Sequence, residues 1–189
     1  MPGFRDTRVY PTTPDVGKAR SLIRQADAAG RTAVLDKCDA FPCPQQAQIV
    51  KTDLARIGLR VQIRELPSAT LFAREGTPGA QFDLAWEGWI PDYFDPQAML
   101  SSIPEDRSVD PTFNDPVYRR KLAEAARLSG PRRYLACGKL DLALARNAAP
   151  LAAFGNLTSD DFFSARMGCQ TCGVYGMDQA ALCLRPTRR

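Results

Sequence analysis

The chain has 189 residues, a formal net charge of +4, 44% apolar residues and 24% charged residues, which is the composition of an ordinary globular domain. These values exclude disorder along the whole chain. The basic residues form no stripe interleaved with aromatic side chains, so we expect no nucleic-acid partner. No apolar run is long enough to span a membrane, and no signal peptide is expected in this chain. The sequence contains no histidine, the commonest general base and metal ligand, and we expect no catalytic residue, metal or cofactor.

The first half of the chain alternates helical and strand patterns. Asp15 is a candidate N-cap, and apolar residues follow it at helical spacing as far as residue 26. Strands are predicted at 32–35 and 59–63, separated by a helix over 42–57 that Gly58 ends. Ser68 is predicted to cap a short helix over 69–75, and another strand is predicted over 82–88.

The second half is mainly helical. A polar loop is predicted over 101–116, followed by helices over 116–128 and 131–147, a buried strand over 150–154 and an irregular tail from residue 160. Strands separated by helices favour an α/β domain with a mixed, mostly parallel sheet flanked by helices. In open sheets of this kind, ligands bind beyond the carboxyl ends of the strands.

The segment 82–96 is the most informative part of the sequence. An apolar strand pattern there runs into a turn that contains both tryptophans of the chain, Trp86 and Trp89, with the acids Glu87, Asp92 and Asp95 beside them. Aromatic surfaces with a few placed carboxylates suit a cationic or amine-bearing ligand. The segment is therefore a candidate binding turn at the end of a strand.

Strand alternation separates the roles within this turn. Trp86 shares a face with Phe82 and Leu84 and is predicted to belong to the core. Glu87 points to the opposite face, where it is expected to line a cleft. Asp95 precedes Pro96 and is predicted to cap a helix over 97–100. An acid pair of Glu87 and Asp92 would also suit a glycosidase, although nothing else in the chain suggests hydrolysis.

Six cysteines suit an exported protein stabilised by disulfides. The pairs Cys38–Cys43, which would close a tight loop before a helix, and Cys169–Cys183, which would hold the tail, are favoured. Cys137 and Cys172 are then left to pair or to stay free. Cys169 and Cys172 also form a redox or half-zinc spacing, but they lie in a glycine-flanked tail without the strand and helix that a redox pair needs.

Four segments together resemble the extracellular solute-binding proteins of family 5, the peptide-binding and related proteins of ABC importers. They are residues 2–20, with a Pro-Gly and a Tyr-Pro followed by a Lys-Ala-Arg; residues 48–61, with an Ile-Gly before a strand; residues 82–96, with Phe-Asp-Leu, Gly-Trp and Asp-Pro; and residues 113–118, with Asn-Asp-Pro. The segments follow the family's order, and each is weak alone.

The resemblance implies a single lobe of the type II periplasmic-binding-protein fold, similar to the second of two lobes that close on a solute. Residues 1–14 would then be an irregular lead-in near the hinge, 15–159 the ligand-binding lobe, and 160–189 a cysteine-containing tail packed on it. The expected partners are a peptide or other small solute, the first lobe and an ABC permease. The expected location is extracellular or periplasmic, with the full-length form tethered as a lipoprotein.

The same resemblance assigns the ligand's α-amino group to Asp92 and an adjacent contact to Trp89, with Glu87 and Tyr93 as further candidate contacts. Glu87 and Pro91 are not required by the family pattern. The family also includes binders of oligosaccharides and metal chelates, so the class of ligand stays open. Two other functions stay open as well: a structural or interaction scaffold without ligand, and a small hydrolase.

Overall fold

The computed structural model describes residues 3, 7–77, 79–103, 113–156, 158, 160–173 and 176–185. The chain divides into two compact units, Met1–Leu151 and Ala152–Arg189. The first contains a parallel sheet with its covering helices and a cluster of further helices, and the second contains short antiparallel ladders. Among the described residues, no helix has the length and apolar character needed to cross a membrane.

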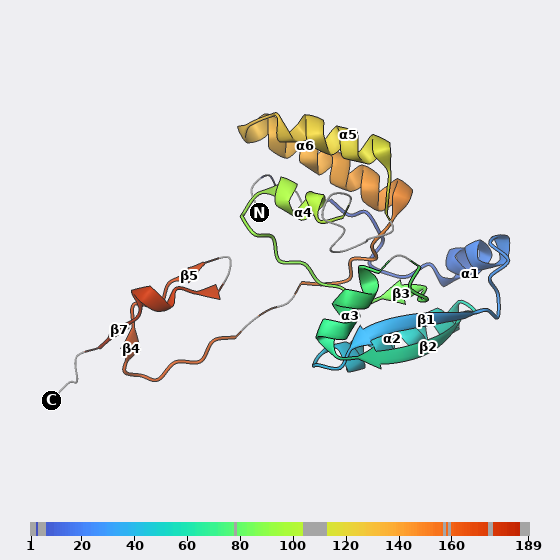
Figure 1. The fold of residues 1–189 in the computed structure, drawn as a ribbon, viewed down its shortest axis with the longest axis horizontal. Coiled ribbons are helices and arrows are strands. Elements are labelled where there is room, and N and C mark those ends of the chain that lie inside the picture. The colour runs from blue at the N-terminus through green and yellow to red at the C-terminus, as the bar shows by residue number, and fades with distance from the viewer. Residues whose placement is uncertain are drawn as a thin grey trace. The chain divides into compact units, whose positions relative to one another are not determined.

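The sheet of the first unit is parallel and has the strand order β2-β1-β3 (Figure 1). Its central strand β1 (Thr32–Cys38) pairs with β2 (Arg60–Leu66) along its whole length and with β3 (Leu84–Ala85) at two positions. Helix α2 (Cys43–Arg56) connects β1 to β2 and packs on one face, where Leu35, Ala47 and Val61 form a buried cluster. The fold is thus the α/β class with a parallel sheet that the sequence predicted.

The opposite face of the sheet is covered by α3 (Ser68–Glu75), which contacts β1. Successive strand side chains point to opposite faces, so Leu35 faces α2 whereas Asp36 faces α3, where it bonds with Arg74. At the start of the unit, α1 (Val16–Gln25) is capped as predicted, because the Asp15 carboxylate accepts a hydrogen bond from the Lys18 amide at 2.8 Å.

Helices α4 (Pro96–Ser101), α5 (Pro116–Ala126) and α6 (Gly130–Ala143) pack on one another, with α5 and α6 side by side (Figure 1). Both α4 and α5 begin with an aspartate cap followed by proline, a sequence that satisfies free amides and fixes the first helical residue. The buried core of this cluster consists of Leu100, Ile103, Tyr118, Leu122, Ala125, Cys137, Leu140 and Leu144.

The predicted strand over 82–88 is wrong in its extent, because β3 spans only Leu84–Ala85. The Asp83 carboxylate accepts the Val34 amide at 2.7 Å, so a side chain takes the donor that a longer ladder would use. The prediction that Trp86 belongs to the core is also wrong. Trp86 is half-buried and Leu84 is 36% exposed, because β3 lies at the edge of the sheet.

Three other sequence predictions are corrected. Ser68 is the first residue of α3 rather than its cap, and it makes no side-chain capping bond. The helix predicted to run to residue 147 ends at Ala143 and continues as a π-helix over Leu144–Ala148. No strand forms over 150–154, and Phe154 is 65% exposed, because a short apolar run does not by itself distinguish a buried strand from an exposed segment.

The second unit has more order than the irregular tail that the sequence predicted. Strands β4 (Met167–Gly168) and β7 (Cys183–Leu184) pair antiparallel, as do β5 (Cys172–Gly173) and β6 (Gly176–Met177). A short 3₁₀-helix, Gln179–Ala181, precedes β7. The disulfide Cys169–Cys183, one of the two pairs expected from the sequence, links the end of β4 to β7 with a Cα–Cα distance of 5.4 Å. The side chain of Cys172 lies outside the described part of the chain.

Candidate functional site

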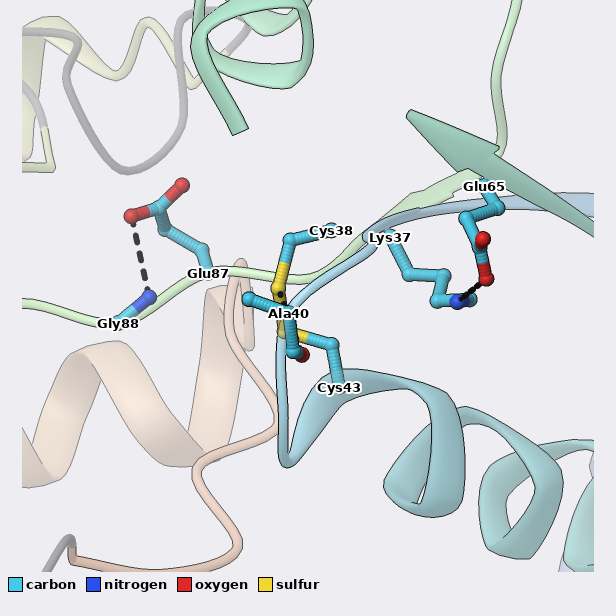
Figure 2. Close-up of a disulfide and its surroundings, with 7 residues drawn as sticks. All are labelled: Lys37, Cys38, Ala40, Cys43, Glu65, Glu87 and Gly88. Carbon is cyan, nitrogen blue, oxygen red and sulfur yellow. Dashed lines mark hydrogen bonds and ion pairs between the residues drawn. A yellow bond between two sulfur atoms is a disulfide. The ribbon is translucent and has the colours of Figure 1, made fainter. Parts of the chain in front are cut away.

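The carboxyl ends of the parallel strands bring two segments together. The chain leaves β1 at Cys38 and enters α2 through the disulfide Cys38–Cys43, the other expected pair, with a Cα–Cα distance of 5.7 Å. The chain leaves β3 at residue 85 and enters the segment 86–95, which we call the Trp-rich turn. Figure 2 shows Glu87 and Gly88 of this turn beside the disulfide. The turn therefore lies where ligands bind in open parallel sheets.

The Trp-rich turn is held at its start by the backbone of β1. The Asp83 amide donates to the Val34 carbonyl at 3.0 Å, and the Trp86 amide donates to the Asp36 carbonyl at 2.9 Å. The Asp83 carboxylate adds the bond to the Val34 amide described above. Because β1 is the central strand, these bonds fix the start of the turn to the most firmly paired part of the sheet.

The end of the turn is held by the helical cluster. Asp95 caps α4 as predicted, accepting from the Gln97 amide at 2.8 Å, and it forms an ion pair with Arg133 of α6 at 3.2 Å. The Tyr93 hydroxyl donates to the Gln97 side-chain carbonyl at 2.6 Å. Asp95 is therefore a structural residue, and Tyr93 presents its ring while its hydroxyl is engaged.

Between these anchors the turn exposes apolar and acidic side chains. Ile90 is 69% exposed, Tyr93 50% and Phe94 43%, which is unusual for large apolar groups unless they contact something else. Asp92 is exposed and makes no hydrogen bond or ion pair with any described residue. Trp89 is half-buried, and its indole N–H has no acceptor among the described residues.

Behind the turn lies a fully buried aspartate that sequence reasoning missed. Asp36 has no exposed surface, and Arg64 donates from Nε and Nη2 to its two carboxylate oxygens, each at 2.7 Å. Arg74 of α3 adds a third bond at 3.0 Å. The hydrogen bond to Asp36 raises the pKa of Arg64 above its usual value. A charge so fully paired fixes β1, β2 and α3 against one another.

A second buried acid, Glu75 at the end of α3, has no such cation. It is 6% exposed, its Oε1 atom is buried without a hydrogen-bond partner among the described residues, and its neighbouring acid is Glu87 of the Trp-rich turn. Burial first, then the neighbouring carboxyl group of Glu87 and the charge of Asp36, raise the pKa of Glu75 to about 9. Burial raises the pKa of Glu87 as well, and the Gly88 amide donates to its Oε1 at 3.0 Å (Figure 2).

The sequence-predicted residues thus share one turn but not one environment. Asp92 and the Tyr93 ring are exposed and Trp89 is half-buried, whereas Glu87 accepts a hydrogen bond from a backbone amide and has Glu75 as a neighbouring acid. The sequence did contain a signal for Glu75, because it follows Leu71 by four residues on a short helix and so shares its buried face. No group of three or more potential metal ligands occurs within the described ranges.

The chain is similar to known proteins in sequence and in fold. The model of the bacterial extracellular solute-binding proteins, family 5 Middle, matches residues 1–109. A periplasmic binding protein, DppA from Helicobacter pylori in complex with the peptide STSA, is 24% identical with a TM-score of 0.66 over 78% of this chain and 30% of its own. A dipeptide binding protein from Pseudoalteromonas sp. SM9913 in complex with Met-Leu is 18% identical with a TM-score of 0.72 over 97% of this chain and 38% of its own.

A third similar structure, HbpA2 from Haemophilus parasuis, is 16% identical with a TM-score of 0.72 over 97% of this chain and 38% of its own. At these identities the structural likenesses establish the fold, which is the type II periplasmic-binding-protein fold. The chain spans between 30% and 38% of the length of these proteins. No curated protein sequence matches the chain.

Proposed function

The chain belongs to family 5 of the bacterial extracellular solute-binding proteins, and from that premise we propose that it is the solute-binding component of an ABC importer. The proposed ligand is a peptide-like or amine-bearing solute. It binds in a cleft between this lobe and a first lobe, and the loaded protein delivers it to an ABC permease. The complexes of similar folds with the peptide STSA and with Met-Leu support the choice of a peptide.

The observation that carries the proposal is the exposed carboxylate of Asp92 in a turn held at both ends. Asp95, not Asp92, caps the following helix, so the capping role that would otherwise explain an acid here is already filled. An acid in a turn that also contains an indole and an exposed tyrosine ring is suited to an ammonium group, because the acid supplies charge and aromatic rings attract cations.

We assign the ammonium group to Asp92, the adjacent apolar contact to Trp89 and a flanking contact to the ring of Tyr93. Glu87 stays a candidate at the rim of the same turn, but its carboxyl group already accepts from the Gly88 amide and neighbours Glu75, so its main role is to hold the turn. In this assignment the residues bind and orient a solute, and none performs a reaction. The family's binding function supports a protein without enzymatic activity.

The proposed organisation keeps residues 1–14 as the segment near the hinge, 15–159 as the binding lobe and 160–189 as a cysteine-containing tail. The full-length protein is proposed to be tethered outside the cytoplasmic membrane as a lipoprotein. The rival is a lobe used only as a scaffold.

The test is a titration of the chain with a short peptide, followed by tryptophan fluorescence, because both tryptophans of the chain lie in the turn. The matched ligand is the same peptide with an acetylated amino group, which lacks the positive charge. We expect millimolar binding of the free peptide, since one lobe offers part of the contacts. An exposed ion pair contributes about 0.2–1 kcal/mol, so acetylation should weaken binding by up to about fivefold.

Asp92→Asn should remove the preference for the free amino group while leaving the fold intact. In a closed two-lobed cleft the same substitution should cost about 2–5 kcal/mol, because water no longer screens the pair. Asp53→Asn, in an exposed ion pair on α2, is the control and should bind like the parent chain. A folded chain that shows no response at millimolar peptide would support the scaffold, and equal preference in Asp92→Asn would remove Asp92 from the site.

A further inference from the structure

The Glu75–Glu87 carboxyl pair is the one contact between α3 and the Trp-rich turn that involves two acids. Glu75 is 6% exposed, and Glu87 is half-buried with Oε1 on the Gly88 amide at 3.0 Å. Glu75 Oε1 and Glu87 Oε2 are buried and have no hydrogen-bond partner among the described residues. Two neighbouring carboxylates away from water repel, and a proton shared between them would give these oxygens a partner.

The neighbouring charges leave the pair without a cation of its own. On β1, Asp36 faces α3, and it is already bonded to Arg64 of β2 and to Arg74 of α3. The Nη2 atoms of both arginines donate to the Gln81 carbonyl, at 2.7 and 2.9 Å. Lys37 of β1 points to the other face of the sheet and is paired with Glu65 of β2 (Figure 2). Asp83, before β3, bonds with the Val34 amide.

We propose that Glu75 and Glu87 are positioning residues that share one proton and thereby fasten the Trp-rich turn to α3, so that the conformation of the turn depends on pH. With the proton present, the pair joins the last turn of α3 to the residue two positions before Trp89. When the proton leaves, two adjacent buried carboxylates repel and Glu87 moves toward water with Gly88 and Trp89. The bonds of Trp86 to β1 and of Asp95 to α4 do not involve this proton and stay in place.

The direction of the pH dependence follows from the raised pKa values of both acids. The pair holds its proton through neutral pH and releases it in the alkaline range, since the pKa of Glu75 is raised to about 9. The chain has no histidine, so no imidazole titrates near neutral pH and adds to the signal of the pair. Two groups of α6 have raised pKa values as well: Asp141 through desolvation, and the Cys137 thiol through burial and the charge of Asp95.

The experiment is a fluorescence titration of the whole chain from about pH 5.5 to about pH 9.5 without any solute. Both tryptophans lie in the turn, so the emission reports on this segment directly. We expect a red shift and stronger quenching by acrylamide as the pH rises, because the indole of Trp89 becomes exposed. The inference does not need solute binding, so it can fail or succeed separately from the proposed function.

Two pairs of variants separate a shared proton from simple packing. Glu75→Gln and Glu87→Gln each place an amide donor opposite the remaining carboxylate, and the emission should stay at its low-pH position throughout the range. Glu75→Ala removes the partner, and the emission should stay at its high-pH position. The matched control Asp141→Asn removes the other acid with a raised pKa and should keep the parent transition.

The outcomes are distinct. Flat titrations in both glutamine variants together with an unchanged Asp141→Asn transition support the pair. A parent-like transition in Glu75→Gln, or its loss in Asp141→Asn, overturns the assignment. If Glu75→Ala fails to fold, the two glutamine variants still decide, because each keeps the volume and the hydrogen bond. A parent chain whose emission does not change over the whole range would also overturn the proposal.

Discussion

Two buried acids on the same face of the sheet are neutralised in different ways. Asp36 is paired by the guanidinium groups of Arg64 and Arg74, with bonds of 2.7 to 3.0 Å. Glu75, on the helix that covers Asp36, has Glu87 for a partner and therefore needs a proton. Both acids lie behind the Trp-rich turn, but Asp36 fixes the strands that carry the turn and Glu75 contacts the turn itself.

The difference shows how a binding surface can be rigid and adjustable at once. Arginine keeps its charge at every physiological pH, so Asp36 has partners that stay cationic. A shared proton is exchanged with water, so the Glu75–Glu87 pair follows the surrounding solution. The family of this chain is extracellular, and an exported protein meets a pH that the cell does not buffer. The following predictions break or sharpen this contrast.

The largest effect is expected from removing the arginine-paired acid. Asp36→Ala leaves two guanidinium groups on the α3 face without their partner, and breaking a buried ion pair costs about 3–5 kcal/mol of unfolding free energy. Urea denaturation monitored by circular dichroism at neutral pH would measure the loss. Because the charge of Asp36 also raises the pKa of Glu75, the loss should be smaller at high pH, where the variant no longer repels an ionised Glu75.

Asp53→Ala provides the comparison for this loss. Asp53 forms an exposed ion pair with Arg56 at 3.3 Å on α2, and such pairs contribute about 0.5 kcal/mol or less. A cost for Asp36→Ala close to that of Asp53→Ala would mean that the buried centre does not fix the strands.

The next effect is the loss of stability with rising pH in the parent chain. The folded pKa of Glu75, about 9, lies above its ordinary value of 4.5, so the folded state binds the proton more tightly than the unfolded state. Its contribution is complete below about pH 4.5 and is lost as the pH rises toward 9. The slope is limited to about 1.4 kcal/mol per pH unit, and partial access of water to Glu87 reduces the total to about 2–3 kcal/mol.

Urea midpoints at several pH values would measure this slope, and Glu75→Gln should remove most of it. Asp36→Ala should lower every midpoint and also reduce the slope, because it removes one of the charges that raise the pKa of Glu75. A parent chain equally stable at both ends of the range would contradict a proton shared between Glu75 and Glu87.

The contrast between the two acids also shows which parts of the fold could be predicted from the sequence. The parallel sheet, the caps Asp15 and Asp95 and the position of the Trp-rich turn follow from local patterns, because spacing and capping are properties of neighbouring residues. The predicted strand over 82–88 is longer than the observed β3. The Val34 amide donates to the Asp83 carboxylate in place of a ladder bond, and these two residues lie 49 positions apart in the sequence. Local alternation contains no information about such a bond.

The same limit explains why Asp36 and Glu75 were missed. A charged residue at the end of an apolar strand is usually exposed, and only the positions of Arg64 and Arg74 make burial of Asp36 possible. Glu75 could be placed on the buried face of its helix by its spacing from Leu71, but its partner across the turn depends on the fold. The exposure of Asp92 likewise depends on the folded turn, because local spacing does not show which of its side chains face solvent.

A smaller effect is expected from the disulfide beside the turn. Replacing Cys38 and Cys43 together by serine opens a loop with a sequence separation of 5, and the chain-entropy relation gives a loss of about 2 kcal/mol for so short a loop. The disulfide lies next to Glu87, but a disulfide does not titrate. The loss of unfolding free energy should therefore be equal at low and high pH. If the double variant instead loses the fluorescence transition, the disulfide rather than Glu75 positions the turn.

The smallest effect should come from an acid neutralised in a third way, by backbone amides. Asp115 caps α5, accepting from the amides of Val117 and Tyr118 at 2.8 and 3.1 Å. Asp115→Ala should cost about 1 kcal/mol in urea denaturation, because water can replace the cap in part at a helix terminus. The helical cluster would weaken while the sheet and its two buried acids keep their partners, so the fluorescence transition of the turn should keep its midpoint. A shifted midpoint would mean that the turn responds to the packing of α5 and α6, and that its pH dependence is not a property of Glu75 and Glu87 alone.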